Sequence, residues 1–216
     1  MTTPQRIVIA SSNAGKLREL TALLHEWPVQ LVIQSDLGVT GVEESGASFV
    51  ENAILKARHA SGITGLPAIA DDSGIEVDIL DGAPGIRSAR FAGPGAGDQK
   101  NLQLLLERVR ATGVTNPVAR FQCLMVFMTH AGDATPVIAQ GTWSGHLAPE
   151  PRGSHGFGYD PIFFVPTHGC TSAELDPAIK NQISHRARAM AGLLQGLRVR
   201  FPAASEIPRR RAGTGR

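Results

Sequence analysis

Runs of hydrophobic residues alternate with polar segments along the chain and predict a series of short strands and helices. Short β-branched or apolar runs are typical of strands, and they occur at residues 6–10, 29–33, 66–70, 75–80, 118–129, 136–143 and 162–165. Apolar residues three or four positions apart are typical of helices, which we expect after Lys16 as far as Pro28 and over 48–61, 98–112, 177–182 and 184–197.

The order of these elements indicates the fold class. Strands and helices alternate at first, strands then cluster, and helices return near the end, which favours an α/β fold with a mixed sheet. Residues 118–129 and 136–143 are expected to form an antiparallel hairpin, and residues 71–74 a tight acidic turn between two strands. Asp98 and Ser184 are expected to cap helices. The glycine-rich segments at 82–97 and 149–160 are expected to be loops that could converge on one cleft.

Length and charge narrow the range of functions. The 216 residues fit one large domain or two closely packed lobes. Residues 198–216 hold six arginines and one glutamate, so the remainder has a formal net charge of −3 in a chain of net charge +2. A nucleic-acid-binding domain would carry its basic excess on the folded body. We therefore expect no nucleic-acid partner, and we expect the arginine-rich residues 202–216 to be disordered.

The cysteines and histidines give no sign of a zinc site, and the hydrophobic pattern indicates the cellular compartment. Cys123 and Cys170 have no zinc-ligand spacing, and we expect both to be reduced and at or near the core. The histidines other than His185 show no spacing typical of metal ligands; they are at positions 25, 59, 130, 146, 155 and 168. The sequence shows neither a signal peptide nor an apolar stretch of the roughly 20 residues that span a bilayer. We expect a soluble cytoplasmic protein with no membrane partner.

The segment Ser11, Ser12, Asn13, Ala14, Gly15, Lys16 follows the first strand and begins a helix. Small residues let a ligand approach the backbone, and a helix N-terminus with a lysine favours a phosphate. It is not a P-loop, because Ala10 and Leu17 stand where that motif needs Gly and Ser or Thr. An ordinary helix start with a solvated lysine is the alternative.

Acidic residues gather in two places, at Glu43, Glu44 and Glu51 and at Asp71 and Asp72. Magnesium favours one or two carboxylates together with water and phosphate oxygens. Glu43 and Glu44 could equally belong to a solvated loop. Two acids at a buried strand end are costly unless a cation or N–H donors neutralise them.

Two later segments could bind a base and a charged group. Glycines flank Phe157, which leaves its ring free for base stacking or makes it a buried plug. Lys180 precedes Ser184, His185 and Arg186, and the last two are expected in the first turn of a helix with their donors pointing outward. A solvated helix start is the alternative.

Together these segments resemble the inosine triphosphate pyrophosphatase family. Seven segments between residues 6 and 197 occur in the family's order: 11–16, 43–53, 70–74, 82–90, 151–153, 157–160, and Lys180 with Ser184, His185 and Arg186. The resemblance implies hydrolysis of noncanonical purine nucleoside triphosphates (ITP, dITP, XTP) to the monophosphate and pyrophosphate. It also implies Mg²⁺, a homodimer, and an elongated two-lobed α/β fold around a long mixed sheet with a central substrate cleft. Residues 1–201 would form this domain, with two inseparable lobes, and 202–216 a basic tail.

The resemblance also assigns roles to particular residues. It implies that Glu44 and Asp72 bind Mg²⁺ and that Asp72 accepts the proton of the attacking water; near the metal we expect the pKa of Asp72 to fall. The implied substrate-binding residues are Ser11, Ser12, Asn13, Ala14, Gly15 and Lys16 at the triphosphate, Lys56, Ser73 and Lys180 near phosphates or sugar, Phe157, Gly158, Tyr159 and Asp160 around the base, and His185 and Arg186 at its oxo edge.

The sequence departs from the family pattern at three positions. Ser12 stands where Gly is common, Arg87 where an aromatic residue is common, and Phe91 where Tyr is common. None of these changes removes a residue with an implied catalytic role. Two other functions stay open: a pyrophosphatase for modified pyrimidine triphosphates on a related fold, and a nucleotide-binding module without catalysis.

Overall fold

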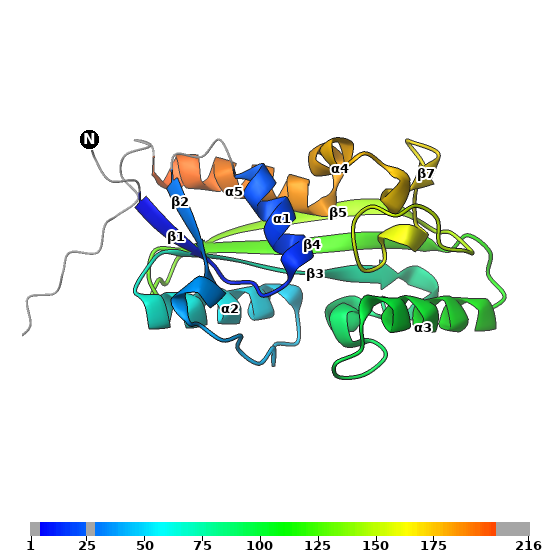
Figure 1. The fold of residues 1–216 in the computed structure, drawn as a ribbon, viewed down its shortest axis with the longest axis horizontal. Helices are drawn as coiled ribbons and strands as arrows, with labels where there is room; N and C mark the ends of the chain where they lie inside the picture. Colours follow the sequence, from blue (N-terminus) through cyan, green and yellow to red (C-terminus); the bar gives the residue numbers. More distant parts are fainter. Residues whose placement is uncertain (1–4, 25–28, 202–216) are drawn as a thin grey trace, which may run out of the picture. The chain divides into compact units, whose positions relative to one another are not determined.

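A seven-stranded sheet forms the centre of the computed structural model, which describes residues 5–24 and 29–201 (Figure 1). Its strands lie in the order β2-β1-β3-β4-β5-β6-β7. Their bounds are β1 Gln5–Ile9, β2 Val29–Ile33, β3 Ala68–Val77, β4 Val118–Met128, β5 Val137–Leu147, β6 Phe163–Val165 and β7 Cys170–Thr171. The helices are α1 Ala14–Leu23, α2 Phe49–Thr64, α3 Asp98–Ala111, α4 Pro177–Ile183 and α5 His185–Arg200.

Both strand directions occur in this sheet. β1 pairs in parallel with β2 and β3, whereas β6 pairs antiparallel with β5 and β7. β4 and β5, the two strands expected to form a hairpin, are neighbours. The predicted class, α/β with a mixed sheet, is confirmed.

The predicted turn at residues 71–74 is wrong. β3 runs without interruption from Ala68 to Val77 and includes both aspartates. Lysines neutralise these carboxylates, so the strand tolerates them in its middle. Gly74 has a packing reason, since a Cβ there would lie 2.4 Å from Gly85 O and from Ser88 Oγ.

The chain divides into two compact units. Unit 1 comprises Met1–Asp72, Leu124–Ala139 and Ala189–Arg216, and unit 2 comprises Ser73–Cys123 and Gln140–Arg188. The boundary in β3 falls between Asp72 and Ser73, two consecutive residues. The two-lobed outline, the central cleft and the domain bounds stay predictions.

Small residues on α2 let it pack closely against the strands of unit 1. Ala53, Ala57 and Ala60 are fully buried against β1, β3 and the end of β4. In Figure 1, α2 lies on the opposite side of these strands from α5. Ser48 caps the helix by accepting from Glu51 N, and Gly65 ends it with φ +67°. These caps and the alanine stripe fix the position of the side chains that α2 presents.

Unit 2 has a larger core of leucines and aromatic rings. The predicted stripe of α3, Leu102, Leu105, Leu106 and Val109, is buried there with Phe121, Trp143, Tyr159 and Phe163. The prediction that Asp98 caps α3 is wrong, because Gly97 occupies the cap position. Asp98 is the first residue of the helix, and its Oδ2 accepts from Gly158 N at 2.8 Å instead.

Several smaller predictions have a clear outcome. Both cysteines are free, with Cys123 buried and Cys170 half-buried, as expected. α1 ends at Leu23; the predicted stop at Pro28 and the predicted disorder of 202–216 lie outside the described residues. Among residues 5–24 and 29–201, every helix is too short or too polar to serve as a membrane span.

Candidate active site

Two aspartates in β3 of unit 1 each meet a different lysine. Asp71 Oδ2 lies 3.2 Å from Lys16 Nζ, and Asp72 Oδ1 lies 2.7 Å from Lys56 Nζ. Successive side chains of a strand point to opposite faces, which is why neighbouring acids reach separate partners. Both aspartates are buried. We name Lys16, Glu44, Lys56, Asp71 and Asp72 the acidic–lysine cluster.

Lys56 is the residue that joins the two predicted metal ligands. Its Nζ lies 3.1 Å from Glu44 Oε1 and 2.7 Å from Asp72 Oδ1. The lysine lies about two turns from the start of α2, and its side chain is largely buried. One ammonium therefore neutralises a strand carboxylate and a loop carboxylate at the same time.

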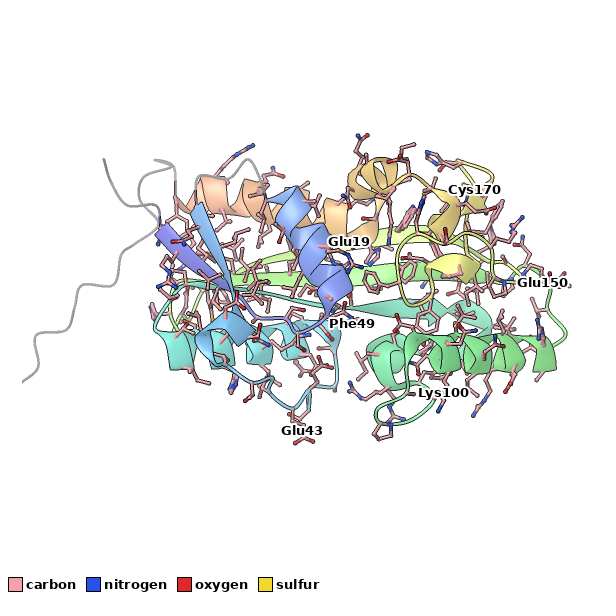
Figure 2. All side chains as sticks on the ribbon, viewed as in Figure 1. Glu19, Glu43, Phe49, Lys100, Glu150 and Cys170 are labelled. Carbon is pink, nitrogen blue, oxygen red and sulfur yellow. The ribbon has the colours of Figure 1, made fainter. Side chains whose placement is uncertain are left out.

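The two adjacent glutamates in the loop before α2 have different environments. Glu43 is exposed and points away from the protein at the outer edge of this loop (Figure 2). Glu44 is half-buried and reaches Lys56. The solvated-loop alternative therefore describes Glu43, while Glu44 belongs to the cluster.

Burial disfavours the charged forms of both members of the Lys56–Asp72 pair. For Asp72 burial raises the pKa, and the charges of Lys56 and Lys16 offset this only in part, so the pKa lies above its usual value. For Lys56 burial lowers the pKa, but Asp72, Asp71 and Glu44 outweigh it, so the pKa is raised. Lys56 thus stays protonated, and Asp72 accepts a proton more readily than an ordinary aspartate. The expected fall in the pKa of Asp72 applies to a metal-bound form and stays a prediction.

The donor set of this cluster suits a metal that arrives with its substrate. Within the described part of the chain, no three carboxylate, histidine or cysteine side chains gather as a ready-made metal cage. Mg²⁺ is usually bound by one or two carboxylates, waters and substrate phosphates rather than by a complete protein cage. Glu44 and Asp72 supply carboxylate oxygens, which Mg²⁺ prefers as ligands. The ammonium of Lys56 already holds these two carboxylates close to one positive charge. These residues fit Mg²⁺.

The segment predicted to bind phosphate begins α1 in unit 1. Asn13 caps the helix, since its Oδ1 accepts from Lys16 N at 3.0 Å, and Ser11 Oγ accepts from Asn13 N at 3.3 Å. Ser12, Asn13 and Ala14 are exposed, whereas Gly15 is buried. The local bonds form an ordered helix start whose lysine belongs to the acidic–lysine cluster.

In unit 2, two cations lie near the ring of Phe157. The half-buried ring has Lys180 Nζ 5.3 Å and Arg186 Cζ 5.8 Å from its centroid, within the range of cation–π contacts. Arg186 also donates to Ser73 Oγ at 3.0 Å. We name Ser73, Phe157, Asp160, Lys180 and Arg186 the aromatic–lysine cluster.

A buried ion pair holds this cluster together. Asp160 Oδ2 accepts from Lys180 Nζ at 2.6 Å and from Phe157 N at 2.8 Å, while its Oδ1 accepts from Ser172 Oγ at 2.8 Å. Each carboxylate oxygen is hydrogen-bonded, which a buried charge requires. Asp160 therefore fixes both the lysine and the backbone that carries Phe157.

The prediction that His185 and Arg186 point outward from a helix start is wrong. Both are buried, with 4% and 1% exposure. Ser184 does precede α5 and accepts from Ala187 N at 3.2 Å, as an N-cap should. The His185 ring stacks on Phe121 with centroids 4.6 Å apart and an angle of 12° between the planes. The aromatic core of unit 2 thus holds the imidazole in one orientation.

Tyr159 and Gly158 lie beside Phe157 but use their polar groups within the fold. The hydroxyl of the buried Tyr159 donates to Ser88 O at 2.8 Å, and burial raises its pKa, helped by the charge of Asp98. Asp98 also accepts from Gly158 N. These bonds tie the residue 157–160 turn to α3 and to the segment at residues 85–90.

Several residues at these clusters were not identified as site residues from the sequence. Asn52, Ser172, Phe121 and Asp98 contact assigned residues directly. Asn52 had a usable signal, because it precedes Lys56 by one helical turn and lies on the same face of α2. The others come from distant segments, so sequence spacing gave no sign of them. Of the family departures, Ser12 and Arg87 are exposed and Phe91 packs against the unit 2 core.

Known proteins support the grouping of these motifs. The family model described as Ham1 family matches residues 7–196. A dITP/XTP pyrophosphatase of Shigella flexneri is 55% identical over 194 residues, which cover 90% of this chain and 98% of the relative. The protein of that name from Escherichia coli K12 is 54% identical over the same shares of the two chains.

Solved structures of similar proteins share the fold. A HAM1 protein from Coxiella burnetii matches with a TM-score of 0.82 and 46% identity, covering 92% of this chain and all of that one. A nucleoside-triphosphatase, named dITP/XTP pyrophosphatase, from Mycobacterium abscessus matches with a TM-score of 0.70 and 40% identity over 88% of this chain and 99% of that one. The family model and these relatives span nearly the whole described chain, so the protein belongs to the Ham1 family.

Proposed function

We propose that this protein is a pyrophosphatase that hydrolyses noncanonical purine nucleoside triphosphates, ITP, dITP and XTP, to the monophosphate and pyrophosphate. Relatives more than 50% identical over most of the chain carry the name dITP/XTP pyrophosphatase. The observation that carries the proposal is the position of Lys56, whose ammonium touches both Glu44 and Asp72. Alternating cations and carboxylates are what a site for a metal–triphosphate complex needs.

In this proposal the acidic–lysine cluster takes the triphosphate. Lys16 and Lys56 supply positive charge, and the N-terminus of α1 presents backbone N–H groups to an anion. Glu44 and Asp72 would hold Mg²⁺. The chemistry that Mg²⁺ supplies when bound is neutralisation of phosphate charge and polarisation of the phosphoryl oxygens.

The reaction consists of the attack of a water oxygen on phosphorus and the loss of pyrophosphate. The bond between the α-phosphorus and the bridging oxygen to the β-phosphate breaks, and that oxygen leaves with its electron pair on pyrophosphate. Asp72 orients the water and takes up its proton, because it is buried and Lys56 holds one of its two carboxylate oxygens. Positioning and charge neutralisation supply most of the catalysis of phosphoryl transfer.

The aromatic–lysine cluster takes the base in this proposal. Phe157 offers a ring face for stacking, which is worth about 1–3 kcal/mol per base. His185 and Arg186 offer donors to an oxo group at position 6 of hypoxanthine or xanthine. The amino group of adenine would set donor against donor, at a cost of about 1–3 kcal/mol for each unpaired group.

The finer biological setting is also a proposal. We expect a homodimer, on the basis of the family resemblance, and light scattering of the purified protein measures this directly. A nucleotide-pool enzyme acts where the pool is, so we place the protein in the cytoplasm. Neither statement is needed for the chemistry of the two clusters.

A panel of nucleotides tests the proposed function. We expect turnover of ITP, XTP and dITP with Mg²⁺, and a kcat/KM for ATP lower by about 100-fold or more, as site-built hydrogen bonding allows. Preference for dUTP would favour the pyrimidine alternative. Tight ITP binding without hydrolysis would favour a binding module.

A further inference from the structure

A buried asparagine links two parts of the acidic–lysine cluster that the chain carries on separate elements. Asn52 lies in α2, is fully buried, and donates from Nδ2 to Asp72 Oδ2 at 3.4 Å. Its Oδ1 accepts from Gly46 N at 2.8 Å. Gly46 ends the short segment that begins with Glu43 and Glu44. One amide therefore contacts both β3 and the glutamate-bearing loop.

The orientation of this amide follows from its partners. Gly46 N can only donate, and a carboxylate oxygen of Asp72 accepts. A flipped amide would set donor against donor and acceptor against acceptor, so the oxygen must face Gly46 and the nitrogen must face Asp72. The space around Gly46 is equally restricted, because a Cβ there would lie 2.7 Å from Asn52 Oδ1.

Asn52 and Lys56 hold the Asp72 carboxylate from two sides. They are four residues apart on α2, so they share one helix face. Lys56 donates to Oδ1 and Asn52 to Oδ2, and each of them also reaches the segment at residues 44–46. A single ammonium fixes one oxygen and leaves the carboxylate free to rotate about that contact. A second donor on the other oxygen sets its plane.

We propose that Asn52 is a positioning residue, which sets the plane of the Asp72 carboxylate and ties the Glu44 loop to it through Gly46. This role rests on the proposed function, because Asp72 matters only where that function holds. The 3.4 Å contact is long for a hydrogen bond, and such bonds at active sites often shorten only when substrate is bound. Asn52 acts through Asp72 and needs no contact with the nucleotide.

The first test replaces Asn52 with alanine and measures kcat and KM for ITP separately. We expect kcat to fall about 30-fold or more, equal to about 2 kcal/mol, while KM changes by less than about threefold. The matched control is Ser61→Ala. Ser61 is a buried residue of the same helix whose Oγ donates to Leu66 O at 2.7 Å, away from Asp72. It should lower the unfolding temperature by a similar amount and change kcat by less than about twofold.

A double-mutant cycle with Asp72→Asn separates positioning from a structural role. If Asn52 acts through Asp72, Asn52→Ala should reduce the residual kcat of the Asp72→Asn variant by less than about threefold. Two independent losses that multiply, or an Asn52→Ala variant that keeps its kcat, would overturn the role while leaving the proposed function intact. A wild-type chain that does not turn over ITP, XTP or dITP would overturn both.

Gly46→Ala serves if Asn52→Ala does not fold. The added methyl group would lie 2.7 Å from Asn52 Oδ1, 2.7 Å from Glu51 Cβ and 3.0 Å from Asn52 N. It therefore pushes on the Asn52 amide and on the first turn of α2, while all native side chains of the cluster remain. We expect kcat to fall about tenfold with KM nearly constant. Gly41→Ala is its control, because a Cβ at Gly41, in the same loop, meets nothing within 4 Å. Equal kcat values for the Gly46→Ala and Gly41→Ala variants would overturn the role.

Discussion

Asp71 and Asp72, which are adjacent in β3, bind two different lysines from two different helices. Asp71 reaches Lys16 of α1, and Asp72 reaches Lys56 of α2. Because strand geometry sends the two carboxylates to opposite faces, only Asp72 shares its lysine with Glu44. The two aspartates are thus adjacent in sequence but have different ion-pair partners.

Substitution of these two aspartates should separate their roles. We expect Asp72→Asn to lower kcat for ITP by at least about 10³, roughly 4 kcal/mol, because it removes the charge by which, in the proposed function, Asp72 binds Mg²⁺ and orients the water. Nucleotide binding should largely persist through Lys16, Lys180 and Phe157. Steady-state kinetics with saturating Mg²⁺ measures both quantities.

Asp71→Asn is the control for this prediction. It keeps the shape of the side chain and removes the carboxylate charge that pairs with Lys16 and that makes no direct contact with Glu44 or Lys56 in the described ion pairs, so its effect on kcat should be smaller. If Asp71→Asn is the more damaging of the two, then Asp71 is the metal-side residue and the assignment is off by one position.

Replacement of Phe157 by alanine should weaken ITP binding and spare the chemical step. Loss of one stacking face costs about 1–3 kcal/mol, so KM should rise about 5- to 150-fold with kcat nearly constant. Phe164→Ala is a matched control, because that ring also lies under a guanidinium, 5.9 Å from Arg152 Cζ, outside the cluster. An unchanged KM for the Phe157→Ala variant would make Phe157 a structural plug.

A charged pair near the end of α5 predicts a pH-dependent contribution to stability. Asp133 is 3% exposed and accepts from Arg200, Thr129 and Thr135. Burial alone would raise its pKa, but the bonds to Arg200 and the two threonines outweigh it and hold the pKa well below the usual range. A lowered pKa means that the stabilisation is present above the unfolded pKa, about 4, and is lost as the pH falls toward the folded pKa.

Asp133→Asn should therefore lower the free energy of unfolding at pH 7 by about 2–3 kcal/mol. The difference from wild type should shrink as the pH falls below about 4. Urea denaturation at several pH values measures it, with the exposed Asp36→Asn as control, expected to change stability by less than about 0.5 kcal/mol. A difference that stays constant between pH 7 and 3 would rule out the charged pair as its source.

Removal of residues 202–216 should leave turnover intact. The segment is rich in arginine, proline and glycine, a composition that buries little apolar surface. The truncated chain still includes Arg200 and Phe201, which contact Asp133 and Phe127. A loss of kcat/KM beyond about tenfold, or about 1.4 kcal/mol, would assign the tail a role in the site or in assembly.

Local patterns in the sequence were enough to predict most elements of the fold. The apolar stripe of α3 and the strand at residues 118–128 depend on periodicities within one segment, and both formed as expected. Asp71 and Asp72 were misassigned to a turn, because their charge is neutralised by lysines 55 and 16 positions away in the sequence. Two adjacent aspartates are more typical of a turn than of a buried strand. The strand forms here because lysines from distant parts of the sequence neutralise their charges.

The same limit explains the errors at the candidate site. A Ser-His-Arg helix start is usually solvated, yet Arg186 is buried, and its guanidinium contacts Ser73 and the ring of Phe157 from distant segments. Asp98 is the first residue of α3 and not its cap, and its carboxylate accepts from Gly158, 60 residues later in the chain. The motifs predicted candidate site residues, while the pairing of Lys56 with both Glu44 and Asp72 required the folded structure.

The most direct test of the proposed chemistry is the product ratio when ITP is incubated with the protein and Mg²⁺. Phosphorus NMR resolves inosine monophosphate, pyrophosphate, inosine diphosphate and free phosphate in one sample. We expect inosine monophosphate and pyrophosphate in equal amounts, formed at a rate that Asp72→Asn reduces by about 10³. Inosine diphosphate with free phosphate, or a product rate that Asp72→Asn leaves unchanged, would contradict the proposed reaction.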